Sequence, residues 1–267
     1  MFLKKVYLCK NIFVMKFDKI EKLVKEYKDL AAETSYSKEY TYYELVYNVT
    51  AFEGSLLTES EVVDLLKYGE KPKKKPEKHV IQVKDCYTAL QYVLQMTRRK
   101  KPLTVDVLHE IAARVMANTG GVCKGDLENY DSSKGEFRKG VVKNASRLFP
   151  DYKRLPFIME QFCDNVNKNI RHTENAEERS ILSYNALYEM LNVFPFGEGN
   201  ISVAFLVYNY IQALCDLPIS FLYKVDGVRF LAIFDQARTQ GNPHSYHVFC
   251  FKQYIKFLEE EIAEMRK

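Results

Sequence analysis

The sequence lacks closely spaced cysteines, a strong excess of either charge, and a clean N-terminal apolar run. Its six cysteines have no C-x-x-C spacing, which excludes a zinc knuckle and predicts a reduced, intracellular and hence cytoplasmic protein. The 39 basic and 35 acidic side chains leave a formal charge of +4, too small to indicate nucleic-acid binding. Residues 1–15 are apolar and basic but are interrupted by Lys10 and Asn11, with no small-residue cleavage site, so neither a signal peptide nor a membrane span is expected.

What remains is an ordinary globular composition with strong helical periodicity. About half of the 267 residues are apolar or aromatic, enough for a substantial core in one large domain or two small ones. The spacing of the apolar residues predicts a mainly α fold. We expect helices near 17–30, 40–52, 59–66, 83–97, 105–118, 154–170, 176–192, 201–215, 228–239 and 244–265. The stretch 67–78, rich in lysine and proline, is expected to be a mobile surface loop or, failing that, a patch for an acidic partner.

One loop stands between two of these helices and has the composition of an anion site. Val193–Asn200 contains a proline, two glycines, one carboxylate and one asparagine, and an apolar helix follows it. The first-turn N–H groups of a helix have no partner within the helix, and the helix dipole adds partial positive charge there. The loop is therefore either a phosphate-binding turn or a plain connection between two helices.

The same loop resembles the signature of the Fic family, enzymes that usually transfer AMP from ATP to a protein hydroxyl. The family pattern is His-Pro-Phe-x-(Asp/Glu)-Gly-Asn-Gly-Arg-x-x-Arg. This chain matches it in order at Pro195, Phe196, Glu198, Gly199 and Asn200. It departs at Phe194, which stands for the His; at Ile201 and Ser202, which stand for Gly-Arg; and at Phe205, which stands for the second Arg.

The resemblance implies a role for each position. In the family the His takes the proton of the acceptor hydroxyl, the acidic residue holds Mg²⁺, and the loop N–H groups and arginines hold the phosphates. Carried over, Glu198 would be the metal ligand, Gly197, Gly199, Asn200 and Ser202 would bind nucleotide, and Phe194 would occupy the general-base position. A phenyl ring accepts no proton, so we expect transfer to be lost or altered and ATP and Mg²⁺ to bind weakly or not at all. His244 or His247, beside the Gly241 turn, is a possible replacement base.

A second resemblance lies near residues 40–54. Many Fic proteins have an inhibitory helix that ends in Glu-Gly or Glu-Asn, and its Glu pairs with the second signature Arg. Glu53-Gly54 fits that ending, although Val49 stands where the family has Ser or Thr. Glu53 is thus a predicted regulatory residue that could also activate water for AMP removal; the alternative is a helix-end carboxylate facing water.

The third resemblance is a hairpin at 135–142. Gly135, Glu136, Phe137, Arg138 and Lys139 resemble the Fic flap, whose edge holds a target segment by strand addition. The implied partner is a protein bound at this flap; the alternative is a surface hairpin with no partner. The family also often self-associates, so a homodimer is possible.

Together these patterns predict a Fic-like domain over 38–255, with an N-terminal extension and helix over 1–37 and a helix end over 256–267. Three hypotheses follow. The chain is a Fic-fold binding or regulatory module that has lost AMP transfer. Alternatively, it is an active Fic enzyme that transfers or removes AMP or another phosphate-containing group. In the third, it is an unrelated all-α protein whose loop match is accidental.

Overall fold

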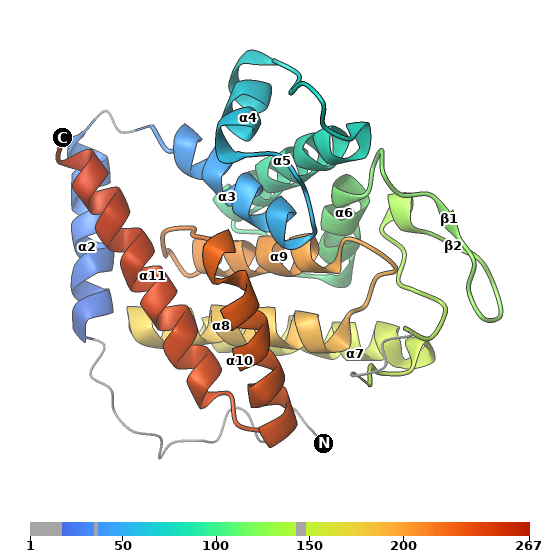
Figure 1. Ribbon diagram of the computed structural model, residues 1–267. Helices are drawn as coiled ribbons and strands as arrows, with labels where there is room; N and C mark the ends of the chain where they lie inside the picture. Colours follow the sequence, from blue (N-terminus) through green and yellow to red (C-terminus); the bar gives the residue numbers. More distant parts are fainter. Residues whose placement is uncertain (1–17, 35–36, 143–147) are drawn as a thin grey trace.

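The computed structural model describes residues 18–34, 37–142 and 148–267, and this part of the chain is mainly helical with one small hairpin. Helix α9 (Asn200–Leu214) lies at the centre, with α8 beneath it and α3, α5 and α6 on its other sides (Figure 1). The hairpin extends at one side, next to α6. The predicted mainly α class is confirmed.

Helix α9 is mostly apolar and is buried along most of its length. Every residue of α9 from Ser202 to Gln212 is buried. A helix that is apolar on all sides is stable only when other elements enclose it. The elements that pack against α9 are α3 (Glu39–Phe52), α5 (Glu77–Arg98), α6 (Val105–Val115) and α8 (Ala176–Val193). The other helical elements are α2 (Asp18–Glu33), α4 (Glu59–Val63), a π-helical turn (Asp64–Tyr68), α7 (Leu155–Ile170), α10 (Gly227–Gln240) and α11 (His244–Met265).

Side-chain caps fix several of the helix starts at the predicted residues. Thr58 accepts the N–H of Glu61, and Glu61 accepts that of Thr58, so the capping box is present. Thr104 caps α6 and Asn175 caps α8 in the same way. At the other end, Gly241 adopts a left-handed conformation and ends α10.

Helix α5 begins earlier than predicted. The spacing of apolar residues placed its start near residue 83, but the helix begins at Glu77, directly after Pro76. A proline before the first turn costs no hydrogen bond, because first-turn N–H groups have no partner within the helix. The predicted surface loop 67–78 is therefore shorter, since the π-helical turn runs to Tyr68 and α5 starts at Glu77.

The predicted position of the hairpin is wrong. Strand β1 (Val122–Cys123) pairs antiparallel with β2 (Tyr130–Asp131), ahead of the predicted range 135–142. Gly135 instead ends a short 3₁₀ turn in a left-handed conformation, and Phe137 forms an isolated bridge with Phe196. The local pattern indicated extended backbone correctly, but the partner of that backbone is the loop before α9.

No helix in the described ranges is long and apolar enough to cross a membrane. The predictions for residues 1–15, which include Cys9, concern residues outside those ranges.

Candidate functional site

The loop between α8 and α9 is built from two left-handed residues and one asparagine. Phe194 ends α8 at φ 50°, and Gly199 precedes α9 at φ 71°. The Asn200 side chain accepts the N–H of Phe196 and donates to its carbonyl, each at 2.9 Å. Asn200 is buried, so its amide braces the loop from inside, and Glu198 is left exposed at the tip.

The first turn of α9 donates two hydrogen bonds to a carboxyl oxygen at the end of α3. Glu53 Oε1 accepts the N–H of Ile201 at 2.8 Å and that of Ser202 at 3.0 Å. Burial raises the pKa of Glu53, the two backbone bonds and nearby Lys78 oppose that rise, and Glu198 adds to it. Glu53 therefore occupies the N–H groups on which the predicted anion site depends.

The position of the second signature arginine is part of an aromatic core. Phe205 is 1% exposed, and its ring lies 5.3 Å from that of Phe52 and 6.2 Å from that of Phe230. Phe52 directly precedes Glu53, so the same packing that replaces the arginine also fixes the end of α3 against α9.

Ser202, which replaces the other signature arginine, is also buried. Its side chain is 1% exposed, and its Oγ has no hydrogen-bond partner within the described residues. The hydroxyl belongs to the residue whose N–H binds Glu53. A buried hydroxyl without a partner is costly, and it stands here at the edge of an anion-binding turn.

Phe194 carries no acid–base group, and its ring has a packing role. The ring lies 5.0 Å from that of Phe149. Its carbonyl accepts a hydrogen bond from Arg138 Nε at 2.9 Å. The general-base position of the signature is thus filled by an aromatic ring that packs, tilted, against Phe149.

The segment predicted as a docking flap is bound to the loop of its own chain. The N–H of Arg138 donates to Pro195 O at 2.9 Å, and the rings of Phe137 and Phe196 pack in a tilted geometry with centroids 5.4 Å apart. Glu136 accepts the N–H of Asp131, and the Gly135 carbonyl lies 2.6 Å from His109 Nδ1. Lys139 pairs with exposed Glu128. Docking of a target at this segment stays a prediction, and its main chain already has several partners within the chain.

Tyr130, on β2, is a site residue that the sequence patterns did not reveal. A Cβ at Gly197 would lie 2.2 Å from its hydroxyl, so only glycine fits beneath this ring. Burial raises the pKa of Tyr130 to about 12. Nothing in the local sequence distinguishes this tyrosine from the other 18 in the chain.

The candidate replacement bases lie away from the loop. His247 bonds Asn185 at 2.8 Å, and burial lowers its pKa to about 4. Asn185 precedes Phe194 by nine helical residues, about 14 Å along α8 at 1.5 Å per residue. His244 lines a separate surface groove between α10 and α11.

The residues at the loop do not form a fitting site for ATP with Mg²⁺. Glu198 offers one exposed carboxylate, and the described residues contain no cluster of three or more His, Cys, Asp or Glu side chains suited to a metal. A triphosphate also needs cations, while the two arginine positions hold Ser202 and Phe205. We therefore derive no chemical step through either group.

These features define a class: a helical protein whose central helix starts with a turn capped by a carboxyl of the same chain, next to an extended segment at 137–138 that pairs with the loop before that helix. A model of the Fic/DOC family matches residues 102–212. Residues 102–212 are thus similar to the Fic/DOC family, and the fold of the chain is that of solved Fic proteins.

Two of the similar structures cover almost the whole chain. A Fic domain containing signaling protein from Bacteroides thetaiotaomicron has a TM-score of 0.72 at 19% identity, covering 92% of this chain and 95% of that one. Fic-1 (residues 134–508) from C. elegans has a TM-score of 0.73 at 19% identity, covering 94% and 74%. At this identity the likeness establishes the fold and not the activity.

Proposed function

We propose that this chain is a Fic-fold binding or regulatory module that has lost AMP transfer and acts through a protein partner. The observation that carries the proposal is the contact of Glu53 with the N–H groups of Ile201 and Ser202. The chain's own carboxyl fills the turn that a phosphate would need. The buried Phe205 beside it removes the charge that would draw a phosphate in.

The position of Phe194 supports the same conclusion. Removing a general base typically costs about 10²- to 10⁴-fold in rate, and a phenyl ring offers no substitute. Positioning and charge neutralisation contribute most of the remaining catalysis of phosphoryl-type transfer, and both arginine positions lack charge. The loop keeps its shape through Asn200 while its chemical groups are replaced.

A second candidate function is AMP removal by an altered Fic enzyme. It is favoured by one observation: a carboxyl, Glu53, lies at the loop with a raised pKa, as a general base for water requires. In the described geometry Oε1 of that carboxyl accepts both N–H groups, so Oε2 is the oxygen that would take the proton from water.

Incubation with Mg²⁺, ATP labelled at the α-phosphate and cell lysate tests the proposal. We expect no protein label above that given by Glu198→Ala. Phe194→His alone should not create transfer, because Ser202 and Phe205 leave the phosphate charge unbalanced. A protein label that disappears in Glu198→Ala would contradict the proposal, and so would strong labelling by Phe194→His.

A further inference from the structure

The net positive charge of the chain is concentrated in one stretch. Residues 67–78, here called the lysine segment, contain six lysines and two glutamates. Their excess of four positive charges equals the formal charge of +4 of the whole chain, so the remaining residues carry equal numbers of Lys/Arg and Asp/Glu side chains. Because lysines held close together repel one another, an acidic partner is favoured at this segment over the rest of the surface.

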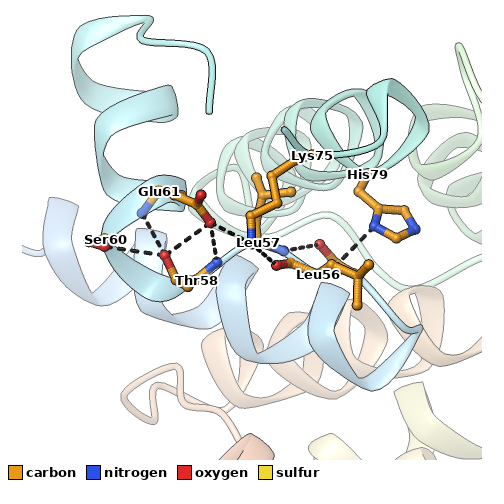
Figure 2. A network of polar contacts seen from close by, with 8 residues as sticks. Leu56, Leu57, Thr58, Ser60, Glu61, Lys75 and His79 are labelled. Carbon is orange, nitrogen blue, oxygen red and sulfur yellow. Dashed lines mark hydrogen bonds and ion pairs between the residues drawn. The ribbon is translucent and has the colours of Figure 1, made fainter. Parts of the chain in front are cut away.

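Hydrogen bonds at both ends fix the backbone of the lysine segment. Near its start, the N–H of Glu70 donates to the Asp64 carbonyl at 3.2 Å. Figure 2 shows the other end, where Lys75 and His79 reach Leu56. Lys75 Nζ donates to the Leu56 carbonyl at 2.6 Å, and the Leu56 N–H donates to His79 Nδ1 at 3.1 Å. The segment therefore presents its side chains from a defined place beside the end of α3.

The chain itself occupies only some of these lysines. Lys75 pairs with Glu61 at 3.2 Å, and Lys71 pairs with Glu77 at 2.8 Å. Both pairs are with carboxylates, which are the anions that an acidic protein segment presents. Three exposed lysines of the segment form no ion pair with any residue that the structure describes: Lys73, Lys74 and Lys78.

A turn at the tip of the segment leaves two of these lysines exposed. Lys73 and Lys74 form the turn, and Lys74 has a left-handed backbone with φ 58°. This conformation costs free energy for any residue with a side chain, so a lysine there is unfavourable for the fold itself. Pro72 and Pro76 restrict the backbone on either side of the turn. The turn is thus preformed, and little conformational entropy would be lost there on binding.

Exposed apolar and aromatic side chains lie next to the lysine segment. Tyr68 is 62% exposed, Leu56 60% and Tyr40 48%. Lys67 Nζ lies 4.4 Å from the centroid of the Tyr40 ring and 5.2 Å from that of Tyr68. The surface therefore combines unpaired positive charge with apolar area that the described structure leaves uncovered.

We propose that the lysine segment, with the exposed side chains of Tyr40, Leu56 and Tyr68, is a docking surface for an acidic segment of a partner protein that also carries apolar side chains. The carboxylates of the partner pair with the three exposed lysines, and its apolar side chains pack on the two tyrosines and the leucine. The lysine segment has no arginine, the residue that holds phosphates by paired hydrogen bonds, so a carboxylate-rich protein fits it better than a nucleic acid. This inference goes beyond the proposed function and does not depend on the loss of AMP transfer.

The test is fluorescence anisotropy of a labelled, glutamate-rich peptide that contains phenylalanine, titrated with the full chain. We expect binding that weakens as ionic strength rises and that is lost when Gln replaces Glu in the peptide. The double variant Lys73→Gln/Lys74→Gln should lower the affinity about five- to tenfold, as for the loss of two exposed charge pairs. Tyr68→Ala should lower the affinity for this peptide but not for one that has Ser in place of Phe.

The matched control is Lys100→Gln/Lys101→Gln. This pair is also exposed, and Lys100 has a similar left-handed φ of 51°. It lies at the opposite end of α5, a helix of 22 residues and hence about 33 Å long, which is several Debye lengths at about 0.1 M salt. The control should therefore leave the affinity unchanged.

Three results would overturn the proposal. Equal losses in the two double variants would show that the peptide responds to net charge and not to the lysine segment. Absence of peptide binding at low ionic strength would show that the surface does not recognise carboxylates. Tighter binding of a single-stranded DNA with the same charge as the peptide would assign the surface to nucleic acid.

Discussion

Replacing Arg138 by alanine is expected to lower the free energy of unfolding by about 3–5 kcal/mol, because three carbonyls would lose their donor at a cost of about 1–2 kcal/mol each. Arg138 is 3% exposed, and its guanidinium donates to the carbonyls of Phe194, Gly140 and Pro150 at 2.7–2.9 Å. Alanine would leave these carbonyls without a donor and open a void beside the loop. Urea unfolding followed by circular dichroism measures the change.

Two variants make this result specific. Arg138→Lys keeps the charge but not the planar fork, so it should recover only part of the loss. Lys139→Ala, at the adjacent residue, breaks only a surface pair with Glu128 and should change stability by about 0.5 kcal/mol or less. If Arg138→Ala proved as mild as Lys139→Ala, the guanidinium would not be what joins the flap segment to the loop.

Gly135→Ala is the second change with a large expected effect. Gly135 has φ +68°, and an added Cβ would lie 2.1 Å from the carbonyl oxygen of His109 and 2.7 Å from the N atom of Ala113. These are backbone atoms of α6 and cannot rotate away. The left-handed backbone costs about 1 kcal/mol and overpacking about 1–3 more, giving a loss of about 2–4 kcal/mol.

Gly241→Ala is the matched control for this prediction. Gly241 has a similar φ of +64°, but an added Cβ there meets nothing within 4 Å. It should therefore cost only the backbone part, about 1 kcal/mol. The difference between the two variants in urea unfolding isolates the contact with α6, and equal losses would show that this contact is absent in solution.

Much of the fold could be predicted because its signals are local. The capping box at Thr58, the cap at Asn175 and the stop at Gly241 each depend on residues within one helical turn. The loop between α8 and α9 was equally visible, since a proline and two glycines interrupt two long apolar patterns. The start of α5 was missed because its first turn carries Lys78 and His79 in place of core residues.

The site could be predicted only in part, because its decisive contacts join distant residues. For Glu53 the sequence left open a regulatory role and a helix-end carboxylate facing water. Its partners are backbone N–H groups 148 and 149 residues away, and no side-chain pattern predicts such a contact. Arg138 was taken for part of a docking edge, whereas it is buried and bonded to the loop. The sequence does not indicate Tyr130, because its ring packs where Gly197 has no side chain.

The replaced positions fit one another physically. Without Phe52 and Phe230, the space beside the Phe205 ring would be unfilled. Without Glu53, two first-turn N–H groups of α9 would have no partner in the described structure. The aromatic packing and the carboxyl cap therefore stabilise the same junction between α3 and α9.

Calorimetric titration of the wild-type chain with ATP, with and without Mg²⁺, tests this account most directly. Because Glu53 holds the N–H groups of Ile201 and Ser202 and both arginine positions of the signature lack charge, we predict no binding in the micromolar range under either condition. A micromolar affinity that requires Mg²⁺ would contradict the account, since the loop would then be a working nucleotide site.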